Sequence, residues 1–439
     1  MPAAPPRIYS GAIVIDAVGT ANWRLADRDN VKIATAINRA ATPFGVFGHR
    51  NFAFVWTSTT LLSTGTQMEA LVLSWYVLNE TGSPFLVGLT WTARMSLNWM
   101  ALFAGAIADR VPRQRLLAAV EFIMATFGLV MFGLLWSGHI AVWHIFGLIV
   151  VMGMVRVFQM PSAQSLVADT LPPERVGNGA AFNHVGMNIG MLVGPLVGGI
   201  LFKAHGPEGA YIVIAMLYFM GGLTTLLIRR LERTVISQRE SVLRTAIEGL
   251  KYVKGEQVLW GTLVLALIIE SSGWTFHTSL IPIFAEQVLN TDSVGLGWLM
   301  FAFGMGALGG SLGWAMVRNL KHVGKLMILS VVVWHAAILV FATSHSFYLS
   351  MLILMVIGGG WASTQVFLLT ALLRTTQSEY RGRVVGLRSL AIYAFALGSM
   401  SSGAMAGAWG APQAAAVVGV MGISLVLVLA VVAPKLRRF

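Results

Sequence analysis

The sequence predicts an all-α integral membrane protein of twelve transmembrane helices, arranged as two pseudo-symmetric six-helix bundles. Hydrophobic residues make up 56% of the 439 residues and charged residues only 11%, whereas about one quarter of the residues of soluble globular domains are charged. Apolar stretches of about 20 residues recur along the chain, and a bilayer core forces such stretches into helices because it offers backbone groups no water. The two halves of the chain also share a sequence pattern.

Twelve apolar segments follow one another from residue 52 onwards. They cover residues 52–78, 84–108, 116–137, 141–163, 178–202, 209–228, 257–284, 294–316, 325–343, 347–371, 384–407 and 412–433. Each is long enough to cross a hydrocarbon core about 30 Å thick. The fifth and sixth segments are separated only by the short link from Lys203 to Pro207, so the count of twelve depends on a chain reversal there.

Basic residues alternate between the connecting loops in the way that the positive-inside rule describes. One set of loops and both termini carry nearly all of the Lys and Arg, whereas the opposite set carries only Lys203. This asymmetry predicts a multi-pass protein of the inner (plasma) membrane with both termini in the cytoplasm. The net charge of +12 then reflects orientation in the membrane, and no nucleic-acid partner is expected.

The segments divide the chain into five parts. Residues 1–48 are expected to form a cytoplasmic tail, because their one apolar run is too short for a signal peptide or a spanning helix. The other parts are an N-terminal six-helix bundle at 49–230, a cytoplasmic linker at 231–256, a C-terminal six-helix bundle at 257–433 and a cytoplasmic tail at 434–439. In the linker, residues 242–254 alternate apolar and basic positions at helical spacing, which predicts an amphipathic interfacial helix.

The two predicted bundles match each other at an offset of 206 to 208 residues. The matching pairs are Val87 with Val294, Trp91 with Trp298, Gly105 with Gly313, Arg110 with Arg318, Gln159 with Gln365, and Arg175 with Arg381. Because an even number of helices separates the two copies, both halves keep the same orientation and are related by an axis along the membrane normal. This arrangement predicts a central cavity between them.

A charged loop motif follows the second segment. It contains Gly105, Asp109, Arg110 and Arg113. The glycine permits close helix contact, the aspartate caps or pairs at a helix end, and the arginines anchor the cytoplasmic face. We predict that these residues form a gating loop, with a weaker latch in the second copy because that copy lacks the aspartate.

A small-residue motif lies in the fifth segment. Its glycines recur at four-residue spacing and are followed by a Gly-Pro step; the residues are Gly186, Gly190, Gly194, Pro195, Gly198 and Gly199. This spacing places the glycines on one face of the helix, where they permit close packing, and the proline bends the helix by removing one backbone hydrogen bond.

On these two motifs the chain resembles the major facilitator superfamily. The loop is similar to the superfamily's signature between helices two and three, with Pro112 in place of the usual second glycine, and the helix-five motif is similar to that of proton-antiporting exporters. The resemblance covers nearly the whole chain after residue 48. The loop around Arg175, the pair Glu248-Gly249 and the run Arg381–Arg383 are most similar to the branch that contains the enterobactin exporter. That branch implies export of drugs, siderophores or other amphipathic metabolites.

Few ionisable side chains lie within the predicted helices, and each is a functional candidate because an unpaired charge there costs several kcal/mol. Glu69 and Arg94 are both expected about 15 Å from the same membrane surface, so they can form an ion pair. We predict that Glu69 is the protonatable group and that its protonation is linked to conformation. The alternative is a static structural pair.

Three further residues are candidates for the cavity. Glu270 and His277 are seven residues apart and are expected on one face of the seventh helix, where they suit a proton site or a cationic substrate, or else bond to neighbouring Ser or Trp. Arg156 is expected near the depth of Glu121, which predicts an ion pair between them. The resemblance implies that an arginine on helix four is linked to proton movement, but residues 157–161 depart from the family pattern.

Other function classes fit the sequence less well. No phosphate-binding loop of an ATP-driven pump occurs, so a gradient must drive transport. The Gly309–Gly313 run matches a serine-nucleophile pattern, but it lies in a Gly-rich helix rather than at a strand-to-helix turn, so we do not expect an enzyme. We expect no metal or cofactor, and as partners a small-molecule substrate, protons and the lipid bilayer, with a monomeric protein. An uptake permease, a non-transporting scaffold and an intramembrane enzyme remain the alternatives.

Overall fold

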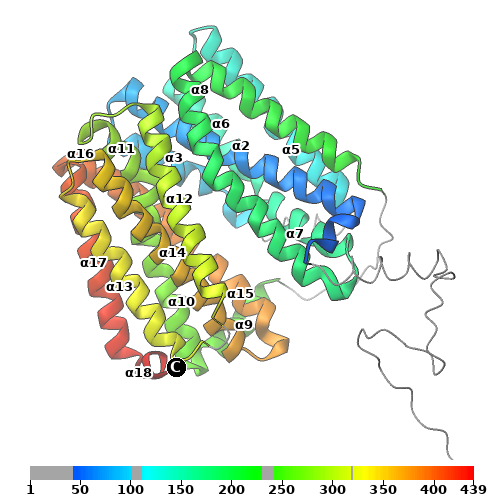
Figure 1. Cartoon of the computed structure of the whole chain (residues 1–439), viewed down its shortest axis with the longest axis vertical. Coiled ribbons are helices and arrows are strands. Elements are labelled where there is room, and N and C mark those ends of the chain that lie inside the picture. Colours follow the sequence, from blue (N-terminus) through cyan, green and yellow to red (C-terminus); the bar gives the residue numbers. More distant parts are fainter. Residues whose placement is uncertain (1–42, 101–110, 230–241, 318–319) are drawn as a thin grey trace, which may run out of the picture.

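The computed structural model describes residues 43–100, 111–229, 242–317 and 320–439. Within these ranges the regular structure is helical, and they contain no strand. Figure 1 shows the helices of the N-terminal half, coloured blue to green, beside those of the C-terminal half, coloured green to red. The all-α fold predicted from the sequence is therefore confirmed.

The N-terminal half consists of helices that run back and forth. They are η2 (Pro43–Gly48), α2 (Arg50–Thr81), α3 (Pro84–Met95), η3 (Asn98–Met100), α5 (Arg113–Trp136), α6 (Val142–Arg156), α7 (Gln159–Asp169), η4 (Pro173–Arg175) and α8 (Val176–Leu226). The backbone of α8 leaves the helical conformation at His205 and Gly206, and Gly206 has a φ of +70°. Because only glycine adopts that region without strain, the chain reverses here, as the sequence predicts. α8 thus contains the fifth and sixth predicted segments.

The C-terminal half begins with the linker helix. Its elements are α9 (Val242–Gly255), α10 (Gln257–Ile269), η5 (Glu270–Trp274), η6 (Phe276–Leu280), α11 (Ile281–Gln287), α12 (Ser293–Ala315), α13 (Val323–Ala342), α14 (Phe347–Thr375), η7 (Ser378–Tyr380), α15 (Arg381–Ser389), α16 (Ile392–Trp409), α17 (Ala411–Val432) and α18 (Pro434–Arg438). Elements η5 and η6 are π-helical turns, which lie in the middle of the seventh predicted segment. Such turns are rare and occur most often at functional sites.

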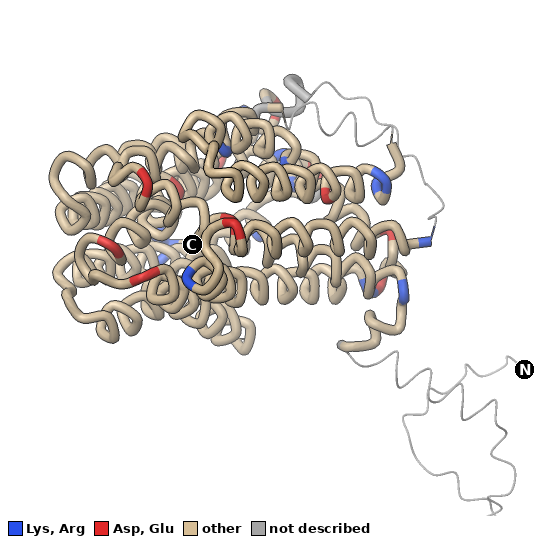
Figure 2. The backbone as a smooth tube through the Cα atoms, turned by 90° about the horizontal axis from the view of Figure 1, so that it is seen from above, with Lys and Arg blue, Asp and Glu red and all other residues tan. Residues whose placement is uncertain are grey.

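Nine helices of the described residues are long and apolar enough to cross a membrane, and α8 with its chain reversal lies within one of these nine spans. Each of the twelve predicted segments overlaps at least one described helix. The structure is thus consistent with twelve spans. Lys, Arg, Asp and Glu, which are blue and red in Figure 2, occupy only short stretches of the chain, as a lipid-embedded protein requires.

The linker helix α9 covers the whole of the predicted amphipathic segment. It packs against α15 of the C-terminal half, and beside this contact the ring of Tyr252 stacks on that of Tyr380 in η7, with centroids 4.1 Å apart. Glu248 of α9 also forms an ion pair of 2.9 Å with Arg383 of α15. The preceding linker residues 230–241 and the tail residues 1–42 lie outside the described residues.

The two halves meet mainly through two helix pairs, α3 with α16 and α8 with α12, with smaller contacts of α3 with η6 and of α2 with α11 and α12. A side chain at Gly88 of α3 would overlap the carbonyl oxygen of Ser399, and one at Gly199 of α8 would overlap that of Ser293. Lys203 and Asp292 form an ion pair of 2.7 Å across the same boundary. We call this region the Lys203 end, and the opposite end, which carries Arg113 and Arg229 as well as Lys435, the basic end.

Candidate functional site

Glu69 lies at the centre of a buried polar cluster in the N-terminal half. Its side chain is 2% exposed, and each of its oxygens accepts from a guanidinium. Arg94 of α3 donates to Oε1 at 3.0 Å, and Arg156 of α6 donates to Oε2 at 2.5 Å. The hydroxyl of Tyr218 on α8 donates to the same Oε2 at 2.7 Å. The ion pair between Glu69 and Arg94 that the sequence predicts is confirmed, and the cluster joins four helices.

Small residues let these helices come close enough for the cluster to form. A Cβ atom at Gly65 of α2 would lie 2.8 Å from the ring of Tyr218, so the ring can come this close to α2 only beside a glycine. A side chain at Gly153 of α6 would overlap the backbone carbonyl of Arg94. The polar side chains are thus positioned by close backbone contacts on both sides.

The predicted ion pair between Arg156 and Glu121 is wrong. The guanidinium of Arg156 donates to Glu69 and also to Thr66 at 3.1 Å and Tyr218 at 2.9 Å. Glu121 instead accepts a hydrogen bond from Ser58. Counting residues from a membrane surface gives the depth of a side chain but not the side of the helix from which it points, and these two residues point to different neighbours.

The cluster has an excess of positive charge. Two guanidiniums face one carboxylate, which leaves a net charge of +1 when all three groups are ionised (2 − 1). Protonation of Glu69 would leave both arginines without a counter-charge in a lipid-embedded interior, where an unpaired charge costs several kcal/mol. The ionised form of Glu69 therefore links α2 to both α3 and α6.

A second polar group lies in the C-terminal half. Glu270 begins the π-helical turn η5 and interacts electrostatically with Arg388 of α15. Arg388 donates a short hydrogen bond to Gln365 of α14. The sequence did not predict this contact, because residue order alone does not show that α15 packs beside the seventh helix.

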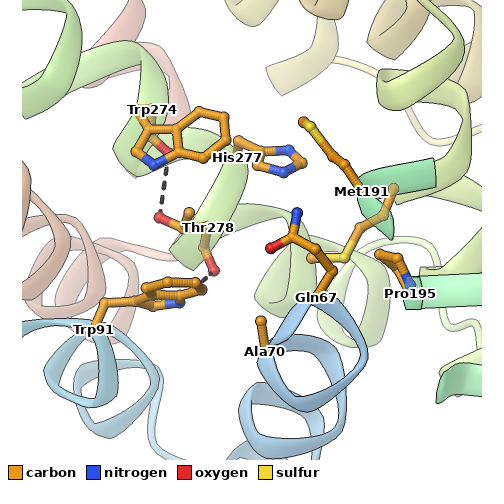
Figure 3. Close-up of a pocket in the computed structure, with 9 residues that line it drawn as sticks. Gln67, Ala70, Trp91, Met191, Pro195, Trp274, His277 and Thr278 are labelled. Carbon is orange, nitrogen blue, oxygen red and sulfur yellow. Dashed lines mark hydrogen bonds between the residues drawn. The ribbon is translucent and has the colours of Figure 1, made fainter. Parts of the chain in front are cut away.

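A pocket lies between the two halves (Figure 3). Its lining comes from both halves and consists of Gln67, Ala70, Trp91, Met191, Pro195, Trp274, His277, Thr278 and Met300. Trp91 of α3 donates to the carbonyl of Thr278 at 3.1 Å, which links the two halves beside the pocket. Apart from one histidine, the side chains of this lining are uncharged.

His277 is the most polar group of the pocket. It is 6% exposed, its ring stacks on that of Phe303 with centroids 3.9 Å apart, and its Nδ1 has no hydrogen-bond partner in the described part of the chain. Figure 3 shows its ring and the amide of Gln67 on the same side of the pocket. Glu270 is not among the residues that line this pocket, so only His277 of the two predicted residues reaches it. The π-helical turns between them change the α-helical register on which that prediction rested.

Of the predicted gating loop, Gly105, Asp109 and Arg110 lie outside the described residues. Arg113 begins α5 and donates to both oxygens of Asp169 at the end of α7, at 3.0 and 2.8 Å. One guanidinium nitrogen, Nη1, makes both bonds, and this ion pair links the start of α5 to the end of α7.

The helix-five motif packs α8 against α2 in the N-terminal half. A Cβ atom would lie 2.6 Å from the backbone nitrogen of Thr64 at Gly190, 2.7 Å from the carbonyl of Thr64 at Gly194, and 2.9 Å from Met68 at Gly198. Pro195 lines the pocket. The motif therefore brings the pocket wall of α8 directly onto the helix that carries Glu69.

Comparison with known proteins decides the family. Residues 41–438 match the transmembrane secretion effector family of the major facilitator superfamily. The chain belongs to this family. It is a multi-pass membrane transporter and not an enzyme, as the sequence predicts.

Two curated relatives cover most of the chain. It is 26% identical over 395 residues to the multidrug efflux pump Tap of Mycolicibacterium fortuitum. The matching region spans 85% of this chain and 93% of Tap. It is 24% identical over 317 residues to the uncharacterised transporter YkuC of Bacillus subtilis, spanning 69% and 72% of the two chains. Over 227 residues, half of this chain and 52% of the relative, it is 28% identical to the multidrug resistance protein MdtG of Enterobacter lignolyticus.

Solved structures confirm the fold. A bacterial homologue of the human lysosomal transporter Spinster, described as inward-facing and unoccupied, superposes with a TM-score of 0.66 at 15% identity over 88% of this chain and 96% of that one. The nucleoside transporter NupG superposes with a TM-score of 0.68 at 12% identity over 87% and 99%. At these identities the likeness concerns the fold alone.

Proposed function

We propose that this protein is a proton-coupled efflux transporter of small amphipathic molecules, which works by alternating access from the inner membrane with both termini in the cytoplasm. The observation that carries the proposal is the coordination of one buried carboxylate by two arginines on different helices. Its similarity to Tap over most of both chains supports drug efflux.

The coupling step begins at Glu69. When a proton neutralises the carboxylate, the guanidiniums of Arg94 and Arg156 lose the charge that offsets their burial. The cluster then favours an arrangement in which at least one arginine moves towards water. Protonation and helix position are thus two sides of one equilibrium.

Helix α3 passes this change to the other half of the protein. It carries Arg94 and also contacts α16, where Thr92 donates to the carbonyl of Ala396 at 2.7 Å. Thr92 and Arg94 are two residues apart on α3, so the contact between the bundles lies next to the contact inside the N-terminal bundle. A shift of Arg94 away from Glu69 would disturb the boundary at which the halves are now closed.

The closed boundary defines the state of the transporter in this proposal. The contacts between halves gather at the Lys203 end, which the distribution of basic residues assigns to the outside. The structure then corresponds to a transporter closed to the outside. Proton binding at Glu69 belongs to the opposite, outward-open arrangement.

The pocket indicates the substrate chemistry. Aromatic rings and methionine side chains give an adaptable apolar surface, and His277 and Gln67 supply hydrogen-bonding groups. We propose a planar, aromatic molecule with at least one hydrogen-bonding group.

The test is transport in proteoliposomes under an imposed pH gradient, with the aromatic dye ethidium as probe. The wild type should accumulate dye only when the gradient is present, and Glu69→Gln should abolish this accumulation. Glu80→Gln is the matched control, because Glu80 lies on the same helix but is exposed. Gradient-driven accumulation by Glu69→Gln at the wild-type rate would reject the proton site, and dye movement in the opposite sense would favour the uptake permease.

A further inference from the structure

Glu121 is a buried acid that the coupling mechanism above does not use. It lies on α5 and is fully buried, at 0% exposure. Its Oε1 accepts a hydrogen bond from the hydroxyl of Ser58 on α2, and Ser58 in turn accepts from Thr225 on α8 at 2.8 Å. Its other oxygen, Oε2, has no hydrogen-bond partner in the described part of the chain.

Within the described ranges, no basic group makes a hydrogen bond or an ion pair with this carboxyl. α2 contributes Ser58, and α8 contributes Thr225 and Gly221, at which a Cβ atom would lie 3.3 Å from Oε1. The other two helices that pack against α5 carry one Arg and one Asp, and both are engaged elsewhere: Arg156 of α6 with Glu69 and Asp169 of α7 with Arg113.

The chemistry of these neighbours favours the uncharged form of the carboxyl. An ionised carboxylate needs several hydrogen-bond donors or a cation to offset its loss of water. The hydroxyl groups of Ser58 and Thr225 do not supply enough donors, because Oε2 of Glu121 has no partner in the described part of the chain. A protonated carboxyl, in contrast, accepts the hydrogen bond from Ser58 through one oxygen, and its other oxygen carries a proton and no charge.

The Glu121 group lies along the same contact between α2 and α8 as Glu69. Ser58 and Glu69 are 11 residues apart on α2, which is about three turns, so both face α8 at positions separated by about 16 Å. On α8, Tyr218 and Thr225 are seven residues apart, which is about two turns and places them on one face. Glu121 is eight residues from Arg113 at the start of its helix, so the group lies towards the basic end.

We propose that Glu121, with Ser58 and Thr225, forms a second proton-binding site in the N-terminal bundle, between the basic end and the Glu69 cluster. In this conformation the site holds a proton. Its use in coupling rests on the proposed function, whereas its protonation does not. A proton that leaves Glu69 towards the basic end would pass to Glu121. Glu121 exchanges its proton when α2 and α8 move apart.

Infrared spectroscopy of the full-length protein in lipid nanodiscs at neutral pH tests the site directly. The spectrum of the wild type minus that of Glu121→Gln should show the C=O stretch of a protonated carboxyl. The corresponding difference for Glu69→Gln should show the carboxylate stretch instead, because Glu69 is ionised between its arginines. A carboxylate stretch in the Glu121→Gln difference would overturn the proposal.

Ser58→Ala provides a second variant that keeps the acid. It removes the hydroxyl donor to Oε1, so the C=O stretch assigned to Glu121 should shift in frequency while the Glu69 signal stays in place. An unshifted C=O stretch would show that the acid detected is not Glu121 and would overturn the proposal even if Glu121→Gln did not fold.

The coupling role has its own readout in proteoliposomes. Glu121→Gln should move fewer protons for each dye molecule than the wild type, and unchanged coupling would reject that role. Failure of Glu69→Gln to affect transport would reject the proposed function but leave the infrared result for Glu121 intact.

Discussion

The hydroxyl of Thr92 donates a hydrogen bond of 2.7 Å to the backbone carbonyl of Ala396 and so ties α3 of the N-terminal half to α16 of the C-terminal half. Arg94 follows two residues later and binds Glu69. One short helix therefore touches both the buried acid and the boundary that closes the protein at the Lys203 end.

Thr92→Val should weaken this boundary without changing the shape of the side chain. The variant loses one hydrogen bond worth about 1 kcal/mol, which corresponds to about a fivefold shift in population towards the form open at the Lys203 end. Distances between spin labels placed on α3 and α16 would measure the shift. If the distance distribution of the variant matched that of the wild type, the bond would have no part in closure.

Arg156→Lys should impair transport although it keeps the charge. The guanidinium of Arg156 donates to Glu69, Thr66 and Tyr218, and an ammonium group cannot reproduce this planar set of contacts. We expect at least about a tenfold loss of gradient-driven dye transport, equivalent to about 1.4 kcal/mol. Arg115→Lys, at an exposed position on α5, is the control and should retain the wild-type rate.

Gly194→Ala should destabilise the protein. The added Cβ atom would lie 2.7 Å from the carbonyl oxygen of Thr64, so α8 must move away from α2 at a cost of about 1–3 kcal/mol. A lower Tm in detergent is the expected result. Gly147→Ala on α6 adds the same methyl group in open space and should leave the Tm unchanged or raise it. Equal effects of the two variants would show that helix-five packing is not the reason for the motif.

The ion pair at the Lys203 end should depend on pH. The hydrogen bond from Lys203 lowers the pKa of Asp292, helped by the backbone amide of Gly295. A lowered pKa means that the contact persists at neutral pH and is lost only as the pH falls through that lowered value. Labels near the chain reversal of α8 and near the start of α12 should therefore separate in acid. Asp292→Asn should show the separated form at every pH, and an acid-insensitive distance in the wild type would contradict this assignment.

The fold was predictable because lipid imposes simple rules on sequence. Segment length, the alternation of Lys and Arg between loops and the repeat placed the helices, and the reversal at Gly206 falls where the short link required it. The pair of Glu69 with Arg94 was predictable for a similar reason, since both depths could be counted from one surface. Physical constraints that act along the chain axis can be read from residue order.

The rest of the site depends on rotation about the helix axes, which the sequence does not fix. Arg156 ends α6 just before a break at residues 157–158, so its side chain reaches Glu69 rather than Glu121. The sequence does not identify Tyr218 as a residue of the site, because a tyrosine in an apolar segment is usually a packing residue. The π-helical turns around Glu270 and His277 alter a register that periodicity arguments take to be α-helical.

The most direct test of the central claim is the proton movement that accompanies substrate flux. In proteoliposomes with a pH dye trapped inside, an imposed gradient of ethidium should drive protons in the opposite direction through the wild type. Glu69→Gln should pass ethidium down its gradient with no change in internal pH. Proton movement by this variant at the wild-type ratio would contradict the account, because the charge that links α2 to α3 and α6 would then not be the coupled proton site.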